Sequence, residues 1–336
     1  MARIAISGFG RIGRNFLRAL LSDPKAAKHL DLVAINIGPA NREMLAHMTK
    51  YDSLMGIYPG VISFAKDELV IDGKRIKILS EVDPARLPWK KLKIDWVVEA
   101  SGHFTKRDGA QKHLDAGAKA VLITAPAKDE DASIIMGLNE KTFDPSKDKI
   151  VSLGSCTTNA VIPMLKVMQD TFGISTGSMT TIHAYTNSQG LLDDLEGKDL
   201  RAARAAAINI IPTTTGAMKM LSKVMPDLAG KINGIAIRVP VAKVSLIDLA
   251  FVAQKRVTVE EIHEACKKAA AGRMKNIMQL SMEPLVSSDY AGSTYSVIVD
   301  GLLTNVQGNL ANIFGWYDNE WAYSLRLKDF LLYTTK

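Results

Sequence analysis

The sequence is poor in cysteine and has no long apolar run. Its 336 residues include only two cysteines, Cys156 and Cys266, which lie far apart in the chain. A disulfide framework is therefore not expected, and a reducing compartment is. A transmembrane helix needs roughly 18 consecutive apolar residues, and no window of the sequence holds them. The first residues form a short apolar stretch that soon meets Gly8, unlike a secretory signal peptide. We therefore expect a cytoplasmic protein with no membrane segment.

Basic residues are in excess but are not clustered. Lys and Arg number 42 against 35 acidic residues, which gives a formal charge of +7. Such a charge would suit a nucleic-acid-binding protein, but the sequence has no run of five basic residues, no internal repeat and no low-complexity segment. We expect no nucleic-acid partner and no metal. A positive field would instead favour an anionic small substrate.

The first part of the chain alternates between predicted strands and helices. Near-continuous apolar strands are predicted at residues 3–7, 31–36, 94–100 and 119–124, and a hairpin at residues 68–80 around Asp72 and Gly73. This pattern predicts an α/β fold of the Rossmann type, a doubly wound domain that binds a dinucleotide.

The pattern changes after Cys156. Longer β-like runs cover residues 177–185, 232–239, 244–253 and 295–299, with one clear helix opened by a capping-box pattern at residues 258–261. They predict an α+β domain with a mainly antiparallel sheet. The final residues are apolar-periodic and predict a helix that packs back on the first domain. We thus expect a dinucleotide-binding domain of residues 1–155 and 320–336, and a second domain of residues 156–319.

A glycine-rich turn follows the first strand. Gly8, Gly10 and Gly13 form a GxGxxG that ends a strand and opens a helix, which is the context that supports dinucleotide binding. The first glycine permits the tight turn, the second lets backbone approach the pyrophosphate, and the third lets helix pack against strand. We expect the cofactor to be bound here by Gly8, Gly10, Arg11, Ile12, Gly13, Asn36 and Thr124.

The choice between NAD and NADP stays open. The fingerprint expects an acidic residue at the end of the second strand, to bind the ribose hydroxyls. That strand ends at Asn36 and Ile37 instead, so a 2′-phosphate would not be repelled, and Asn41 and Arg42 follow closely. Alternatively, Asn36 and backbone groups hold the NAD ribose. We expect NAD as the cofactor, with NADP possible.

Cys156 and His183 are the candidate catalytic pair. Cys156 follows a β-like run and precedes an apolar helical run, so it should lie at a helix N-terminus, where the pKa of a thiol is lowered and the thiolate is the nucleophile. His183 lies within a β run, where its side chain can be held rigidly toward a site as a base. A histidine buried in the core is the alternative interpretation.

Several separate motifs then occur in a family's order. They are SCTTN at residues 155–159, HAYTN at 183–187, PTTTGA at 212–217, RVP at 238–240 and WYDNEW at 316–321, with GFGRIGR at 8–14 and KYDS at 50–53. Together they resemble the phosphorylating glyceraldehyde-3-phosphate dehydrogenases over essentially the whole chain.

The resemblance implies a role for each motif. Cys156 would attack the aldehyde of glyceraldehyde 3-phosphate, and His183 would act as the base, giving a thioester that inorganic phosphate releases as 1,3-bisphosphoglycerate. Thr186 and Arg238 would bind the phosphate of the substrate. Ser155, Thr157, Thr215 and Gly216 would bind the attacking phosphate, and Asn319 would hold the nicotinamide carboxamide. The second domain would then be the catalytic one.

The resemblance also implies an NAD(P)-dependent oxidoreductase of glycolysis or gluconeogenesis that forms a homotetramer. Two alternatives remain: an erythrose-4-phosphate dehydrogenase, which PTTTG disfavours because it preserves the second phosphate pocket, and a non-catalytic dinucleotide-binding regulatory or RNA-binding protein. The sequence departs from the family's usual pattern at Ile37, Val82, Ala160 and Ala202. Ile37 and Val82 bear on cofactor choice, and Ala202 on anion binding.

Overall fold

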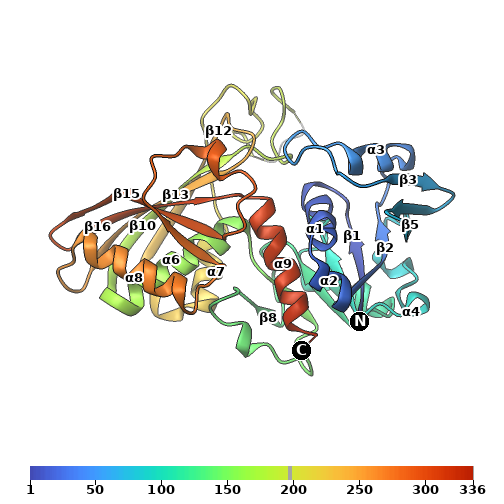
Figure 1. Ribbon diagram of the computed structural model, residues 1–336, viewed down its shortest axis with the longest axis horizontal. Helices are drawn as coiled ribbons and strands as arrows, with labels where there is room; N and C mark the ends of the chain where they lie inside the picture. Colours follow the sequence, from blue (N-terminus) through green and yellow to red (C-terminus); the bar gives the residue numbers. More distant parts are fainter. Residues whose placement is uncertain (196–198, 336) are drawn as a thin grey trace. The chain divides into compact units, whose positions relative to one another are not determined.

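The computed structural model describes residues 1–195 and 199–335, and the chain divides into two compact units (Figure 1). Unit 1 comprises Met1–Ile134, Lys141–Gly154 and Ser324–Lys336, and unit 2 comprises Ile135–Glu140 and Ser155–Tyr323. Among the described residues, no helix is long and apolar enough to cross a membrane. The same residues contain no group of three or more His, Cys, Asp or Glu side chains that could hold a metal ion.

Within its described residues, unit 1 is built on a nine-stranded sheet of order β3-β4-β5-β2-β1-β6-β7-β9-β8. The strands are β1 (Ala2–Ser7), β2 (Leu30–Asn36), β3 (Ile62–Ala65), β4 (Glu68–Ile71), β5 (Lys74–Leu79), β6 (Trp96–Glu99), β7 (Ala120–Ile123), β8 (Ala132–Ser133) and β9 (Ile150–Ser152). Neighbours are parallel except in the pairs β3–β4 and β4–β5. The predicted doubly wound sheet is confirmed, and Asp72 and Gly73 form the predicted hairpin turn with positive φ at both residues.

Helices of unit 1 lie on both faces of this sheet. They are α1 (Arg11–Leu21), α2 (Pro24–His29), α3 (Leu45–Lys50), α4 (Trp89–Leu92), α5 (Arg107–Asp115) and most of α9 (Trp321–Tyr333), with short 3₁₀ turns at Arg42–Met44 and Pro84–Arg86. A further 3₁₀ turn, Glu140–Thr142, begins with the last residue of a unit 2 segment and continues into unit 1. Successive side chains of β6 point to opposite faces. The Trp96 ring packs edge-on against Phe330 of α9, with centroids 5.7 Å apart, whereas Val97 joins an apolar cluster with Trp89 of α4.

The strand order reverses around β1, which has β2 on one side and β6 on the other. In open α/β sheets, ligands bind outside the carboxyl ends of the strands at such a switch point. The turn that begins at Gly8 follows β1, and the turn at Ser101 follows β6. These two turns therefore lie side by side at the edge of the expected crevice.

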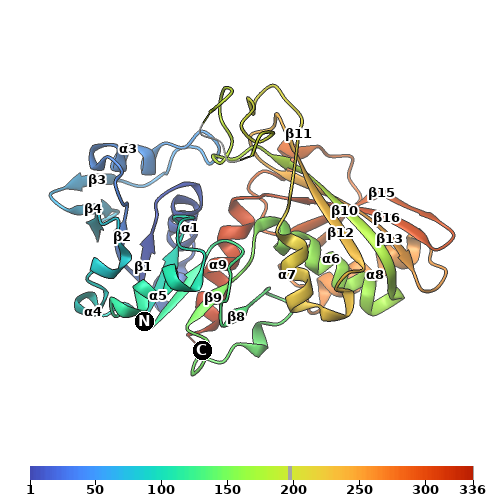
Figure 2. The ribbon, with the colours of Figure 1, turned by 180° about the vertical axis from the view of Figure 1, so that it is seen from behind.

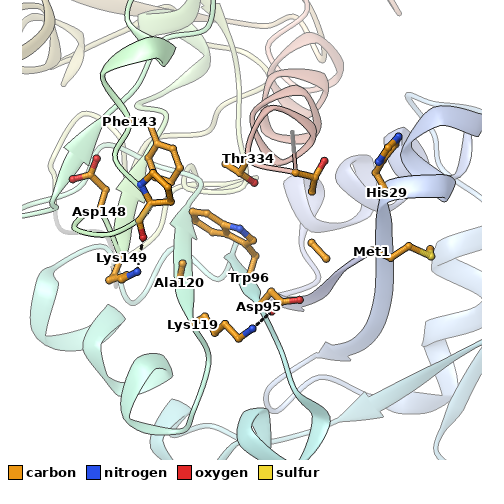
Figure 3. A pocket seen from close by; sticks show the side chains of 13 residues that line it. Met1, His29, Asp95, Trp96, Lys119, Ala120, Phe143, Asp148, Lys149 and Thr334 are labelled. Carbon is orange, nitrogen blue, oxygen red and sulfur yellow. Dashed lines mark hydrogen bonds and ion pairs between the residues drawn. The ribbon is translucent and has the colours of Figure 1, made fainter.

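The opposite, amino edge of this sheet holds a cavity of about 420 Å³ (Figure 3). The rings of Trp96 and Phe143 form one wall, with centroids 6.1 Å apart. The Lys119 Nζ atom lies 2.8 Å from Asp95 Oδ1, and Lys149 donates to the carbonyl oxygen of Pro145. Because these polar groups are satisfied by other groups of the cavity wall, nothing here favours a particular ligand.

Unit 2 is built on a seven-stranded sheet, counted over its described residues, of order β11-β12-β10-β13-β16-β15-β14. The strands are β10 (Ile174–Ala184), β11 (Ile211–Thr213), β12 (Ile232–Val239), β13 (Ser245–Ala253), β14 (Met278–Ser281), β15 (Val297–Gln307) and β16 (Leu310–Tyr317). Only the pairs β10–β12 and β14–β15 are parallel among these strands. The sheet is therefore mainly antiparallel, as predicted.

Helices α6 (Cys156–Phe172), α7 (Ala217–Val224) and α8 (Val259–Ala271) cover one face of this sheet (Figure 2), and 3₁₀ turns lie at Pro226–Leu228 and Ser287–Tyr290. The predicted capping box of α8 is present: Thr258 Oγ1 accepts from Glu261 N, and Glu261 Oε2 accepts from Thr258 N. The prediction of one helix among the strands was wrong, because α7 is a second. Its eight residues are too few to carry a strong periodic signal.

Candidate active site

Cys156 is the first residue of α6, the central helix of unit 2. Ser155 is the N-cap: its Oγ accepts from Thr158 N at 3.1 Å, and Thr158 Oγ1 accepts from Ser155 N at 3.2 Å. This reciprocal capping box fixes the start of the helix. Cys156 is partly buried.

His183 faces this cysteine from β10. Its Nε2 lies 3.5 Å from Cys156 Sγ, within hydrogen-bonding distance for sulfur. Arg238 is the register partner of His183 on the neighbouring parallel strand β12, and its Nη1 lies 2.6 Å from His183 Nδ1. The parallel pairing of β10 and β12 thus brings a thiol, an imidazole and a guanidinium together.

Two groups compete for the Nδ1 atom of His183. The carbonyl oxygen of Ala184 lies 2.6 Å from it and can only accept, whereas the Arg238 guanidinium can only donate. If Nδ1 carries the proton and donates to Ala184, Nε2 presents a lone pair to the thiol and can act as a base. If Nδ1 accepts from Arg238, Nε2 carries the proton and would suit a thiolate.

Burial dominates the protonation of this pair. It raises the pKa of the Cys156 thiol, and the opposing effects of Arg238 and of the N–H groups of Thr157 and Cys156 do not offset it. Burial, followed by the charge of Arg238, lowers the pKa of His183 to about 3. The N–H groups at the start of the helix do lower the thiol pKa, as expected, but desolvation outweighs them because burial disfavours the charged form. The resting pair is a neutral thiol beside a neutral imidazole.

Tyr317 belongs to the site, although it was not predicted. Its hydroxyl lies 3.0 Å from Thr157 Oγ1 and 2.7 Å from Thr181 Oγ1, and its ring meets that of His183 edge-on. It thereby joins the start of α6 to the strand that carries His183. Tyr317 lies inside the WYDNEW motif, and alternation along β16 places it on the buried face, so the signal was available.

The other predicted anion-binding residues form their hydrogen bonds within their own loops. Thr186 Oγ1 lies 2.8 Å from Ser188 Oγ, and Thr215 Oγ1 accepts from Ala217 N. Gly216 is the exposed N-cap of α7. The structure thus groups Ser155, Thr157 and Arg238 around the Cys156–His183 pair, and places Thr186, Thr215 and Gly216 on loops.

Asn319 is buried just after β16. Its Oδ1 accepts from Ser245 Oγ at 3.3 Å, and this hydroxyl accepts in turn from Ala184 N, next to His183. Asp318 beside it forms a buried ion pair with Lys243 at 3.0 Å. The segment that carries Asn319 is therefore anchored to the same strand as His183.

The glycines of the turn between β1 and α1 serve two different purposes, close packing and space for a ligand. A Cβ at Gly8, where φ is +94°, would lie 2.3 Å from Ser101 N, and a Cβ at Gly13 would lie 2.3 Å from Gly8 O. Both glycines are required by packing. A Cβ at Gly10 would meet no protein atom within 4 Å, so the space beside Gly10 is open to a ligand at the N-terminus of α1.

The remaining predicted cofactor residues surround the same edge of the sheet. Asn36 uses its amide on the neighbouring turn, because Nδ2 donates to Glu81 O and Oδ1 accepts from Glu81 N. The Arg11 guanidinium pairs with Asp52, so it is engaged within the protein. Ile12 is half-buried in the first turn of α1, and Thr124 follows β7 with its N–H bound to Glu99 O.

Comparison with known proteins identifies the family. Residues 155–319 match the model of the glyceraldehyde 3-phosphate dehydrogenase C-terminal domain, and residues 2–107 match that of its NAD binding domain. The chain belongs to the glyceraldehyde 3-phosphate dehydrogenase family. Similar proteins include glyceraldehyde-3-phosphate dehydrogenase 1 of Bacillus cereus, 48% identical over 100% of this chain and 99% of the relative. The Geobacillus stearothermophilus enzyme is 50% identical over 98% and 97%. That of Streptomyces coelicolor is 49% identical over 98% of each chain.

Membership of this family makes the protein an oxidoreductase with NAD as its cofactor. The relatives carry the name of the glyceraldehyde-3-phosphate enzyme, so the erythrose-4-phosphate alternative is not favoured. A non-catalytic role is not favoured either, because the thiol and the imidazole that such chemistry requires lie in contact.

Proposed function

We propose that this glyceraldehyde 3-phosphate dehydrogenase family member oxidises and phosphorylates glyceraldehyde 3-phosphate through a covalent intermediate on Cys156. The observation that carries the proposal is the 3.5 Å contact between Cys156 Sγ and His183 Nε2 at the N-terminus of α6, with Arg238 beside it. This arrangement provides a nucleophile, a base and a cationic anchor for an anionic substrate.

The turn after β1 fits the pyrophosphate of NAD. The open space at Gly10 and the backbone N–H groups at the start of α1 are what a dinucleotide phosphate needs. Gly8, Gly10, Arg11, Ile12 and Gly13 would hold it through backbone groups. Thr124 and Asn36 would contribute to the same cofactor site, and Asn319 would orient the carboxamide. When bound, NAD supplies the acceptor for the hydride that the substrate carbon gives up.

The neutral pair suits the first chemical step. Cys156 Sγ bonds to the aldehyde carbon while the thiol proton passes through His183 Nε2 to the carbonyl oxygen, which gives a thiohemiacetal. His183 then takes the hydroxyl proton as hydride leaves, and a thioester remains. The N–H of Cys156, in the first turn of α6, would stabilise the oxyanion. Inorganic phosphate attacks the thioester carbon, the C–S bond breaks, and the sulfur regains its proton.

Two anion sites support this sequence of steps. Arg238 and Thr186 would bind the phosphate of the substrate, since a guanidinium can bind phosphate oxygens bidentately. Ser155, Thr157, Thr215 and Gly216 would receive the attacking phosphate through hydroxyl and N–H groups. Binding of an anion by Arg238 would also draw its guanidinium away from His183 Nδ1. The Nδ1 proton could then bind Ala184 O, which leaves Nε2 free as the base.

NADP is a possible second cofactor. Ile37 is buried where an acidic residue is usual, so no carboxylate at that position repels a 2′-phosphate. Arg42 lies close by, with its Nε bound to Ser80 Oγ at 2.8 Å and its Nη1 paired with Asp67. Because Asp67 offsets much of this charge, we propose NAD as the preferred cofactor.

We also propose a cytoplasmic homotetramer, with residues 1–155 and 320–336 as the dinucleotide domain and residues 156–319 as the catalytic domain. The oligomer is supported by the loop that follows Thr186, in which apolar side chains lie more than two-thirds exposed in the single chain: Leu191, Leu192, Leu200, Ile208 and Ile210. Such a concentration of exposed apolar surface marks an interaction site.

Initial rates with glyceraldehyde 3-phosphate and inorganic phosphate test the proposal. We expect phosphate-dependent reduction of NAD that is abolished in Cys156→Ser, and slower reduction of NADP. Cys266→Ser is the matched control, because Cys266 is fully buried in unit 2, and it should retain activity. Absence of phosphate-dependent activity with either cofactor would exclude the proposed reaction.

A further inference from the structure

A fully buried chain of three side chains lies behind the crevice of unit 1. The indole of Trp89 on α4 donates to His113 Nδ1 on α5 at 3.0 Å, and His113 Nε2 lies 3.0 Å from Glu99 Oε2 at the end of β6. Trp89 and His113 are 0% exposed, and Glu99 is 2% exposed. No step of the proposed chemistry uses any of them.

The hydrogen bonds fix where the proton of the imidazole lies. An indole N–H can only donate, so His113 Nδ1 must accept from Trp89. A neutral imidazole then carries its proton on Nε2, which donates to Glu99. The other oxygen of Glu99 accepts from both the N–H and the hydroxyl of Ser101. Each polar atom of the chain therefore has a partner of the required kind.

Ser101 connects this chain to the cofactor site. A Cβ added to Gly8 would lie 2.3 Å from Ser101 N and 2.4 Å from Ser101 Cα, so the turn after β6 packs directly against the glycine turn. The two turns follow the strands on either side of the switch point, where the crevice opens. Whatever holds Ser101 in place also determines the position of Gly8.

We infer that Glu99 is a positioning residue for the dinucleotide: through its bonds to Ser101, and oriented by the Trp89–His113 pair, it holds the second wall of the crevice against the glycine turn. The inference rests on the proposed binding of NAD at this crevice and deepens it. Glu99 does not touch the cofactor. It acts by keeping the turn at Ser101 in the one arrangement that leaves Gly10 open.

Glu99→Gln tests the inference with almost no change in shape. An amide presents one acceptor where the carboxylate presents two, so its NH₂ must face a donor, either Ser101 N or His113 Nε2. If it faces His113, the imidazole proton must move to Nδ1, where it meets the Trp89 N–H. A buried donor left without an acceptor is costly, and we expect the dissociation constant for NAD to rise about tenfold.

The hydrogen-bonded chain Trp89–His113–Glu99 predicts that a second substitution restores NAD affinity to Glu99→Gln. A purely structural role for Glu99 would not predict this recovery. In Glu99→Gln with Trp89→Phe, the indole N–H is gone, and the proton on His113 Nδ1 no longer meets a second donor. We expect the double variant to bind NAD more tightly than Glu99→Gln alone, although Trp89→Phe by itself leaves a cavity. Titration calorimetry measures each dissociation constant without depending on tryptophan fluorescence.

Asp95→Asn is the matched control, since Asp95 lies next to the amino end of the same strand. It accepts from Arg3 N and pairs with Lys119, so the variant should lose stability but retain wild-type affinity for NAD.

With saturating NAD, Glu99→Gln should also keep the kcat and the KM for the aldehyde substrate. Ser101→Ala removes one bond to Glu99 with little risk to folding, and should weaken NAD binding severalfold.

Three results would overturn the inference: wild-type NAD affinity in Glu99→Gln or in Ser101→Ala, equal weakening in Asp95→Asn, or a double variant that binds more weakly than Glu99→Gln. The readout is direct binding, so it does not depend on turnover. A wild-type protein that binds NAD but fails to oxidise glyceraldehyde 3-phosphate would remove the proposed reaction and leave this inference standing.

Discussion

The function of His183 as a base depends on which of its two ring nitrogens carries the proton. Its Nδ1 lies 2.6 Å from both a carbonyl oxygen and a guanidinium nitrogen, and its Nε2 faces a thiol. Because burial lowers its pKa to about 3, the ring stays neutral at physiological pH, and the change that matters is between tautomers. Arg238 thus acts on the base as well as on the substrate phosphate that we propose it binds.

Replacing His183 with Asn should remove the base while leaving a polar group of similar size. We expect kcat to fall by about 10²- to 10⁴-fold, the usual range for loss of general acid–base catalysis, with little change in the KM for NAD. His263→Asn is the control, because the imidazole of His263 on α8 is hydrogen-bonded to Gly301 O rather than to the catalytic pair. A His183→Asn enzyme with near wild-type kcat would mean that another group takes the proton.

The carboxyl group of Asp52 should make the stability of the protein depend on pH. Burial alone would raise its pKa, but the bonds from Arg11 and from the N–H groups of Met55 and Leu54 lower it from 3.8 to about 2. A carboxyl with a depressed folded-state pKa contributes stability that is complete above 3.8 and is lost as the pH falls to about 2. Wild type should therefore unfold at higher urea than Asp52→Asn at pH 6. This difference should shrink between pH 4 and pH 2, and a difference that is independent of pH would contradict the assignment.

At the scale of elements, each catalytic feature lies at the end of a helix or strand. The thiol begins α6, the imidazole lies one residue before the end of β10, and the glycine turn joins β1 to α1. Ends of regular elements place side chains rigidly and also leave free backbone N–H groups. Anions are favoured at such places because the helix N-terminus carries a partial positive charge.

We expect substitutions of Gly8 and Gly10 in the β1–α1 turn to have different effects, one on stability and the other on NAD affinity. Gly10→Ala adds a methyl group where no protein atom lies, at a φ of −74°, so the protein should fold normally but bind NAD more weakly. Gly8→Ala forces a side chain into positive φ against Ser101 and should cost about 2 kcal/mol or more. Thermal unfolding and NAD titration of both variants distinguish them. Wild-type affinity in Gly10→Ala would show that the cofactor does not approach this backbone.

At the scale of the whole molecule, the exposed apolar side chains are unevenly distributed. Leu192 is 74% exposed in the loop after Thr186, close in sequence to several other exposed leucines and isoleucines. A single chain gains nothing from this surface, and water penalises it by roughly 25 cal/mol per Å². A second copy that covered the loop would remove the penalty.

Leu192→Asp should therefore alter assembly and leave the subunit folded. We expect light scattering to report a smaller particle than wild type at the same concentration, with an unchanged circular dichroism spectrum. Val61→Asp introduces the same charge at a site that is also 74% exposed, but in unit 1. If both variants kept the wild-type particle size, this loop would not be the interface.

Much of the fold could be predicted from the sequence, since apolar runs, the Asp72–Gly73 turn and the capping box at Thr258 are local signals. The nucleophile could be placed at a helix start for the same reason. The raised pKa of Cys156 could not be predicted, because desolvation depends on what packs around it. Nor could Asn36 be assigned its bonds to Glu81, since that contact joins segments 45 residues apart.

The contrast between the two sulfur atoms has a practical consequence. Burial raises the pKa of both thiols, but Cys266 is completely buried while Cys156 is partly exposed. An alkylating reagent added to the folded protein should thus modify one position only. The moles of label incorporated per mole of chain then count competent active sites, so the fraction of working molecules in a preparation can be determined without an activity standard.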